Sequence, residues 1–291
     1  MSFKKKLMAL GIALVFSVAA AAPAFAETLD QFWLDYPNLT LYDSNYSYVL
    51  NRGGGQDVAV QAIDGSWMAP TLFQESGLAD AISWSVIPAA SGVSVVDNGH
   101  DGDADIYGGF WAPARIGVSG TAAYGAYIVE AENPAENTID FAVAVNPPEP
   151  QTNVSANVRI YNGGLGSSYL AKSSSDVSVA YNNIATTIKY PSALDALAAV
   201  ANVSSYTYGG SVYVNSVTFT PNNSDTAMTL PDLTNPISNY YWTYCVYDSA
   251  GNRVDLSYNI GAEMYDIDSN CTVVWVYGGW VDYPSTLAEI L

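Results

Sequence analysis

The stretch YPSALDALAAVANVSSYTYGGSVYV, residues 190–214, decides the fold because its period is helical while most of the chain reads as strand and turn. Pro191 suits the first position of a helix, where a missing N–H costs nothing. Asp195 favours the positive end of the helix dipole, and Asn202 is a stop signal. An apolar stripe at i, i+3, i+4 and i+7 consists of Leu194, Leu197, Ala198 and Ala201.

This predicted helix needs a partner surface. A helix of about eleven residues is only ~16 Å long and is marginal by itself. Strand-like runs flank it, two before (153–162, 175–183) and three after (210–219, 239–248, 271–278). The order β-β-α-β-β-β predicts an α+β domain in which the helix packs across one face of a mixed sheet. We expect the opposite face of that sheet to stay free.

The part of the chain upstream of the helix has the rhythm of an all-β domain. Between Tyr46 and Asn146, short alternating runs are separated by turns, which is typical of a β-sandwich. For example, Phe141, Val143 and Val145 face one way, with alanines between them. The predicted strands are 46–50, 56–63, 81–87, 92–96, 114–120, 123–131 and 137–146.

This upstream domain resembles a bacterial immunoglobulin-like domain in its strand rhythm and in the tryptophan, Trp84, of a central strand. It lacks the cysteines that flank the tryptophan in antibody-type domains. The fold class that we predict is therefore mainly β: an N-terminal immunoglobulin-like β-sandwich, followed by a β-grasp-like α+β domain with one helix packed on a mixed sheet.

The N-terminus predicts export. Lys4, Lys5 and Lys6 precede an apolar run, and Ala24-Phe25-Ala26 is a small-x-small cleavage signal before Glu27. The apolar run is shorter than the roughly 20 residues that a membrane span requires. We therefore interpret residues 1–26 as a signal peptide and expect a protein that is secreted or held at the cell surface, with no integral membrane segment after cleavage.

Proline-rich sequence places the domain boundary. The prolines of the PPEP run cannot donate backbone hydrogen bonds to a ladder, and they stiffen the chain. The expected parts of the chain are a lead-in (27–45), a sandwich (46–146), a linker (147–151), an α+β domain (152–280) and a tail (281–291).

The composition is strongly acidic. The formal net charge is −19, and loss of the three leader lysines changes it to −22. Nucleic acid needs clustered Lys and Arg, and anionic lipid attracts cationic segments, so neither is an expected partner. Divalent cations are compatible with this charge.

Four sequence segments of the C-terminal part carry a family resemblance. They are ALDAL (193–197), YGGSVYVNSV (208–217), YYWTYCVY (240–247) and GAEMYDIDSNCTVVWVYGG (261–279). Together they resemble the transcobalamin-like C-terminal domain, a β-grasp relative found in exported bacterial proteins and at the end of cobalamin carriers. The resemblance covers about residues 152–280. It departs from the family in the longer segment 248–259 and in Asn270-Cys271, where the family has Gly-Asp.

The resemblance implies a domain that presents a ligand, which in the carriers is a corrinoid. The carriers also have a separate helical domain, which this chain lacks, so a complete cobalamin carrier is excluded and a partial contact with cobalamin is what remains. Aromatic side chains suit stacking on macrocycles or sugars. The candidate ligand-binding residues are Tyr208, Tyr240, Tyr241, Trp242 and Trp280. The alternative is that these aromatics form sheet core and cross-strand pairs.

An acidic stretch, DNGHDGDADIYGG at 97–109, is the candidate calcium site. Calcium takes six to eight oxygen ligands, and four carboxylates lie close together in this sequence. They belong to Asp97, Asp101, Asp103 and Asp105. The EF-hand positions for Gly and Glu, counted from Asp101, hold Ile106 and Ala112 instead. A solvated turn is the alternative.

The two cysteines, Cys245 and Cys271, predict one disulfide, because an even count in an exported chain favours pairing. Two free thiols or a metal pair are the alternatives. The single histidine, His100, lies far from both cysteines in the sequence.

Catalysis has little support, because one histidine leaves few nucleophilic arrangements and no phosphate loop, zinc motif or serine elbow is present. We predict a non-catalytic binding or adhesion protein with a small-molecule or glycan ligand, or other surface proteins, as partner. The alternatives are a structural surface protein that self-assembles into a layer or filament, with calcium as a candidate requirement, and a secreted hydrolase acting on glycans.

Overall fold

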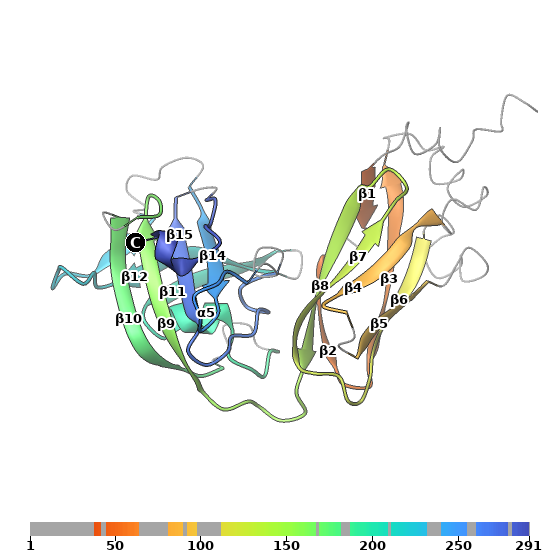
Figure 1. The fold of residues 1–291 in the computed structure, drawn as a ribbon, viewed down its shortest axis with the longest axis horizontal. Helices are drawn as coiled ribbons and strands as arrows, with labels where there is room; N and C mark the ends of the chain where they lie inside the picture. The colour runs from red at the N-terminus through yellow and green to blue at the C-terminus, as the bar shows by residue number, and fades with distance from the viewer. Residues whose placement is uncertain are drawn as a thin grey trace, which may run out of the picture.

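The computed structural model describes residues 38–41, 45–63, 81–89, 92–97, 112–166, 169–181, 187–208, 211–231, 240–254, 260–278 and 281–290 (Figure 1). The predicted fold class is confirmed: the chain is mainly β, with a β-sandwich followed by an α+β domain in which one helix packs on a mixed sheet. The predicted signal peptide lies outside the described residues. No helix among the described residues is long and apolar enough to cross a membrane.

The sandwich consists of two four-stranded sheets. The first, in the order β1-β3-β6-β5, contains β1 (Asn38–Leu41), β3 (Gly55–Ile63), β6 (Ala112–Val118) and β5 (Val93–Asp97). The second, in the order β2-β8-β7-β4, contains β2 (Ser47–Asn51), β8 (Thr138–Asn146), β7 (Gly125–Glu132) and β4 (Ser83–Ile87). Strand β2 pairs parallel to β8, and the other neighbours pair antiparallel.

Strict alternation builds the sandwich core. Phe141, Val143 and Val145 of β8 are fully buried between the sheets, as their spacing predicts. The Trp84 ring lies 6.0 Å from the Phe141 ring, centroid to centroid. All seven predicted strands are present. Strand β1 was not predicted, because four residues are too few for a clear period and only pairing with β3 makes them a strand.

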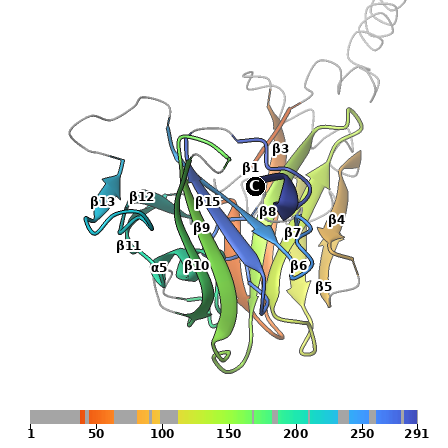
Figure 2. The same ribbon diagram turned by 60° about the vertical axis from the view of Figure 1, so that its left-hand side comes forward.

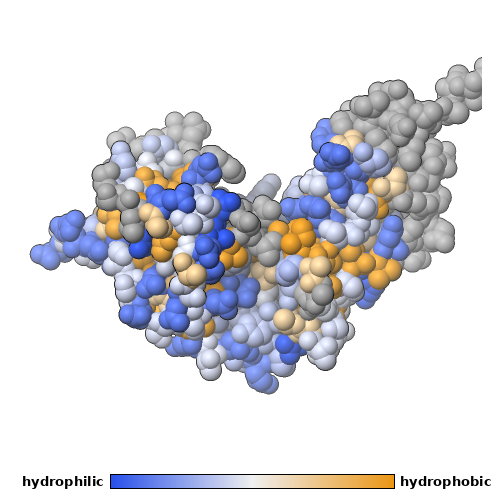
Figure 3. Space-filling view, in the orientation of Figure 1, coloured by the Kyte–Doolittle hydropathy of each residue, from blue (hydrophilic) through white to orange (hydrophobic). Residues whose placement is uncertain are grey.

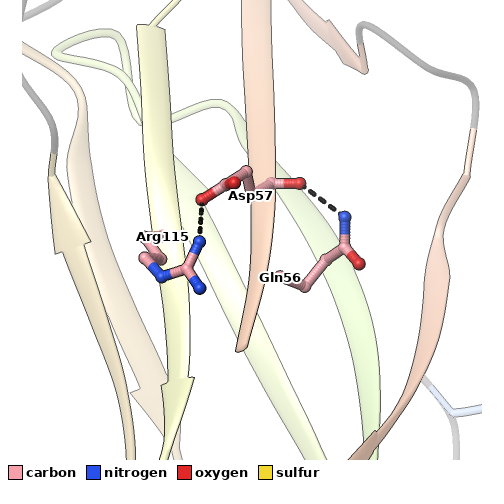
Figure 4. Close-up of polar contacts among 3 residues, drawn as sticks. All are labelled: Gln56, Asp57 and Arg115. Carbon is pink, nitrogen blue, oxygen red and sulfur yellow. Dashed lines mark hydrogen bonds and ion pairs between the residues drawn. The ribbon is translucent and has the colours of Figure 1, made fainter. Parts of the chain in front are cut away.

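A cross-strand ion pair marks the register of β3 and β6 on the exposed side of the first sheet. Asp57 and Arg115 lie opposite each other, and Arg115 Nη1 donates to Asp57 Oδ1 at 2.6 Å (Figure 4). Gln56 Nε2 donates to the backbone carbonyl oxygen of Asp57. Both charged side chains are about half exposed, so the pair contributes at most ~1 kcal/mol.

The C-terminal domain is built on a mixed sheet. Its order is β10-β9-β15-β14, with β10 (Leu170–Val179), β9 (Val154–Asn162), β15 (Thr272–Tyr277) and β14 (Trp242–Tyr247). Strands β9 and β15 are parallel, and the other two pairings are antiparallel. A smaller sheet contains β11 (Asn202–Tyr208), β12 (Ser211–Phe219) and β13 (Met228–Leu230). Strands β11 and β13 were not predicted.

Helix α5 (Ala193–Ala198) is shorter than predicted and begins later. Ser192 is the N-cap, so Pro191 precedes the helix instead of starting it. Asp195 N–H donates to Ser192 Oγ at 3.1 Å, and Ser192 N–H donates to Asp195 Oδ2 at 3.0 Å, which completes a capping box. Asn202, predicted as the stop of the helix, is the first residue of β11.

The helix lies where the sequence predicted, across one face of the mixed sheet. Leu194 and Leu197 are at most 1% exposed and belong to the same core as Val273 and Trp275 of β15. The helix also contacts β9, β10 and β11, so it lies between the mixed sheet and the β11–β12 hairpin (Figure 2). This burial stabilises a helix that is too short to persist alone.

The expectation that the other face of the mixed sheet stays free was wrong. Residues 281–290, including the 3₁₀ turn η5 (Leu287–Ile290), cover it. Tyr283 is 2% exposed, and its hydroxyl lies 2.9 Å from Thr243 Oγ1. Val274 and Val276 of β15 point to this side while Val273 and Trp275 point to the helix, so the sheet is buried on both faces. The predicted tail is therefore part of the domain.

The disulfide prediction was also wrong: no disulfide joins Cys245 and Cys271, and both thiols are buried. Cys245 packs with the C-terminal segment on one face of the sheet, whereas Cys271 packs in the core on the helix side. Cys245 lies opposite Val274 in the ladder, so Cys271 is displaced along the strand as well. A disulfide needs Cβ atoms that point toward each other, and the sheet separates these two.

Replacing Tyr283 by Ala tests the role of the C-terminal segment. We expect the free energy of unfolding to fall by ~3–5 kcal/mol, as for other truncations of a buried aromatic ring. Urea unfolding followed by tryptophan fluorescence measures it. Tyr169→Ala is the matched control, because Tyr169 is 53% exposed, and it should change stability by less than ~0.5 kcal/mol. Equal effects of the two variants would contradict the assignment of residues 281–290 to the core.

Thiol labelling tests the state of the cysteines. In the native protein we expect no reaction with a maleimide, because both thiols are buried and burial raises the pKa of Cys271 to about 12. In urea without reductant, two labels per chain are expected by mass spectrometry. Val96→Cys, at a 59% exposed position, should add one label in the native state. No labelling in urea would instead indicate a disulfide.

Candidate ligand-binding surface

Three tyrosines form an exposed aromatic surface on the β11–β12 hairpin, which we call the hairpin tyrosine face: Tyr206, Tyr208 and Tyr213. They are 55%, 74% and 46% exposed, respectively. Tyr206 and Tyr213 are cross-strand partners, and their rings stack with centroids 5.5 Å apart and planes 19° apart. The stacked pair presents a flat apolar surface edged by phenolic hydroxyls.

The alternation of the two strands explains why these rings point outward. Val203 of β11 and Val212 and Val214 of β12 are partly buried against the core around α5. Successive residues of a strand point to opposite faces, so the tyrosines between these valines point away from the core. With the register shift between Ser204 and Ser205, the tyrosines stay on the outer face along the whole hairpin and the valines stay on the core face.

A buried carboxylate anchors the hairpin. Glu263 is 3% exposed, and its Oε1 accepts a hydrogen bond from the backbone N–H of Val212 at 2.9 Å. Burial raises the pKa of Glu263, and the bond from Val212 opposes this shift. Glu263 belongs to residues 260–268, which we call the junction loop. This loop therefore holds the strand that carries Tyr213.

The junction loop also joins the two domains. Asp266 Oδ1 accepts a hydrogen bond from Ala126 N–H of β7 at 2.9 Å. The neighbouring Gly125 has φ +129°, and a Cβ atom there would lie 2.8 Å from Asp266 Oδ2, so only glycine fits. Ser47 of β2 and Ser211 of β12 bring their Oγ atoms within 3.2 Å. The sandwich residues Ala126, Ile128, Ala142 and Ala144 share one core with the C-terminal domain.

Burial of the Asp266 carboxylate at this junction is electrostatically unfavourable. Burial of the carboxylate, with a smaller repulsion from Asp268, raises the pKa of Asp266 from 3.8 to about 6, against the stabilising bond from Ala126. Tyr127 and Tyr190 also face this carboxylate, and burial followed by its charge raises the pKa of both phenols. Asp266 is therefore protonated at a higher pH in the folded protein than in the unfolded chain.

The predicted ligand-binding residues that the structure describes lie in two separate places. Tyr208 lies on the small sheet, whereas Tyr240, Tyr241 and Trp242 lie at the start of β14. Tyr240 and Trp242 both contact Tyr277, with ring centroids 5.7 and 5.3 Å away, and Trp242 is the cross-strand partner of Tyr277. These two contacts match the cross-strand alternative. Tyr241 is 46% exposed. Trp280 lies outside the described residues, and the ligand-binding roles of this group stay predictions.

The predicted calcium site is only partly described. Asp97 is the last residue of β5, and Asp101, Asp103 and Asp105 lie outside the described residues. Within the described part of the chain, no three His, Cys, Asp or Glu side chains form a group that could hold a metal ion. Calcium binding at 97–105 therefore stays a prediction.

Sequence reasoning missed Tyr206 and Tyr213. The density of aromatics drew attention to residues 240–247, but density alone does not distinguish core from surface. The signal that was available is the period of two in SSYTY and SVYV. In SVYV, where valines alternate with a tyrosine, the valines are expected on the core side and the tyrosine on the solvent side. In SSYTY the two tyrosines are spaced by two and therefore share one face.

Known structures match this chain only weakly. The sialic acid binding region of a Streptococcus sanguinis adhesin is 14% identical, with 66% of this chain and 47% of that chain covered and a TM-score of 0.18. The Ig1-2 module of the Drosophila receptor protein tyrosine phosphatase DLAR is 13% identical, with 82% and 98% covered and a TM-score of 0.22. Cadherin domains 1–4 of protocadherin gamma B7 are 10% identical, with 84% and 51% covered and a TM-score of 0.22.

The chain spans about half the length of the adhesin region and of the protocadherin fragment. No family model matches the sequence, and no curated protein matches it significantly. The transcobalamin-like resemblance therefore stays a prediction.

The pH dependence of stability tests the buried carboxylate of the junction. Between pH ~4 and ~6 the native state binds a proton at Asp266 that the unfolded chain does not, so stability rises as the pH falls. From pH 7 to pH 5 this group alone should raise the free energy of unfolding by about 1 kcal/mol. Urea unfolding at both pH values measures the rise.

Other buried carboxyls, such as Glu263, shift in the same direction, so the contribution of Asp266 is obtained by difference. Asp266→Asn keeps an oxygen for Ala126 N–H and should show a smaller rise between pH 7 and pH 5 than the wild type. The control, Asp225→Asn at an exposed position, should keep the full rise. Equal rises in wild type and Asp266→Asn would refute the assignment.

Proposed function

We propose that this protein is an exported, non-catalytic binding protein of the cell surface or its surroundings, and that it holds carbohydrate on the hairpin tyrosine face. The observation that carries the proposal is the stacked pair of Tyr206 and Tyr213, beside the still more exposed Tyr208. A tyrosine ring offers a flat apolar face for the C–H face of a sugar and a hydroxyl for its edge.

The exposure of these rings favours a role outside the fold. Other large aromatics of this domain, such as Trp275 and Tyr247, are almost fully buried and contribute to stability by packing. A cluster of three exposed rings on one face stabilises the fold little, and such clusters on soluble proteins commonly mark interaction sites. The face of the molecule seen in Figure 3 mixes hydrophilic and hydrophobic residues.

Export is supported by the predicted signal peptide at residues 1–26 and by the acidic composition. The transcobalamin-like resemblance implies a ligand-presenting domain, and its segment YGGSVYVNSV (208–217) contains Tyr208 and Tyr213 of the hairpin. Cobalamin is the ligand that this resemblance alone would imply, and it therefore serves as a comparison ligand in the test below.

Tyr206→Ala and Tyr213→Ala test the proposal. Each should weaken binding about tenfold, because each removes one half of the stacked platform and stacking contributes ~0.5–1.5 kcal/mol per ring contact. A glycan array with the full mature chain identifies ligands, and isothermal titration with the best ligand measures affinity. Tyr169→Ala is the control that should bind as the wild type does, because Tyr169 is an exposed tyrosine that precedes β10.

Three results would overturn the proposal. The first is that no carbohydrate binds to the wild type on the array or in titration. The second is that a carbohydrate binds equally well to the wild type and to the Tyr206→Ala/Tyr213→Ala double variant. Saturable binding of cobalamin in place of carbohydrate would also contradict it.

A further inference from the structure

The outer face of the small sheet continues beyond the tyrosines as a set of hydroxyl groups. We call this part the hydroxyl end: Ser204, Ser216, Thr218 and Thr229. Ser204 and Ser216 are cross-strand partners, as are Thr218 and Thr229. The Oγ1 atoms of Thr218 and Thr229 lie 2.8 Å apart, so one hydroxyl donates to the other and leaves further acceptor and donor capacity at the surface.

The strands of the small sheet contribute no charged side chain to this face, and the Lys172 ammonium lies beyond the end of β12, where it donates to the Thr220 carbonyl at 3.1 Å. Residues 202–219 and 228–230 contain no Asp, Glu, Lys or Arg, in a chain with 28 acids and 9 bases. Glu263, which contacts the hairpin, is buried and accepts a hydrogen bond from the backbone N–H of Val212. The surface therefore offers stacking at one end and neutral hydrogen-bonding groups at the other.

We infer that the ligand of the hairpin is a neutral, extended polysaccharide that lies along the strands from the hairpin tyrosine face to the hydroxyl end. This inference rests on the proposed function and specifies its substrate class. The hydroxyls of Ser and Thr hydrogen-bond sugar hydroxyls without a charge on either partner, and the tyrosine rings stack on the sugar rings.

The lack of cationic side chains on these strands disfavours acidic glycans as ligands. Carboxylate and sulfate groups are recognised by Arg and Lys, which form charge-assisted hydrogen bonds, and the hairpin has neither. The net charge of −19 repels polyanions further. Cationic sugars would find no carboxylate on this face to pair with.

Dimensions favour a chain over a single sugar. Strand β11 has seven residues and is therefore ~23 Å long, and the tyrosines occupy only its C-terminal part. Tyr206 and Tyr208 lie toward the hairpin turn, while Ser204 and the Thr218–Thr229 pair lie toward the other end. A ligand that contacts both ends must extend along the strands.

Native gel electrophoresis in gels that contain a soluble polysaccharide tests the inference with the mature chain. Hydroxyethyl cellulose, xylan and galactomannan are the neutral probes, and polygalacturonate is the anionic probe. We expect retardation by at least one neutral probe, unchanged when the salt concentration rises from 50 to 500 mM. We expect none by polygalacturonate.

The hydroxyl end is tested by Thr218→Val/Thr229→Val, which removes both hydroxyls of the pair and leaves neither unpaired. Loss of one or two ligand hydrogen bonds should weaken binding of the retarding polysaccharide three- to tenfold. Thr207→Val is the matched control, because Thr207 is exposed on the same hairpin but belongs to the opposite face. Ser204→Ala is a second variant that should weaken binding in the same direction should the double variant be poorly folded.

The outcomes separate this inference from the proposed function. Salt-sensitive retardation by polygalacturonate that Tyr206→Ala abolishes would overturn the neutral class while the carbohydrate role stands. Neutral binding that Tyr206→Ala abolishes but that Thr218→Val/Thr229→Val and Ser204→Ala leave unchanged would overturn the extended footprint alone. Failure of every probe, together with an empty glycan array, would overturn both.

Discussion

The structure depends on the hydrogen bonds between the first turn of α5 and the junction loop. A six-residue helix leaves most of its backbone groups without intrahelical partners. Ala193 N–H donates to the Tyr265 carbonyl at 3.0 Å, and Leu194 N–H donates to the Ala262 carbonyl at 2.9 Å. The same loop sends Glu263 to β12 and Asp266 to β7, so one segment of nine residues holds the helix, the hairpin and the sandwich together.

This arrangement makes a single loop responsible for the position of the aromatic surface. The loop buries two acids, and each accepts a hydrogen bond from a backbone N–H of another element, which partly offsets the cost of burial. Because alanines and Ile128 of the sandwich share the core around α5, the domains are joined by packing as well as by these bonds. A strongly acidic chain that buries carboxyls at its junction is most stable where some of them are protonated.

The aromatic residues show why density in the sequence is a poor guide to a binding surface. YYWTYCVY is the richest aromatic segment, yet its Trp242 packs on Tyr277 across the ladder. The tyrosines at 206 and 213 occur singly among Ser, Thr and Val, and they are the exposed, stacked pair. The role of each ring depends on the strand face that carries it and on the residues that pack against it. Alternation predicts the face, and only packing determines the partner.

Local periodicity in the sequence alone determined all sandwich strands except β1 and the presence of a helix near residue 194, because periods of two and 3.6 are properties of short segments. The order of the strand-like runs around that helix predicted its packing on a mixed sheet. Tertiary structure decided the rest. Ser192 and the loop carbonyls set the length of the helix, and the hydrophobic second face of the sheet recruited residues 281–290. The sheet keeps Cys245 and Cys271 on opposite sides. Each of these depends on contacts between residues far apart in the chain, which no local pattern encodes.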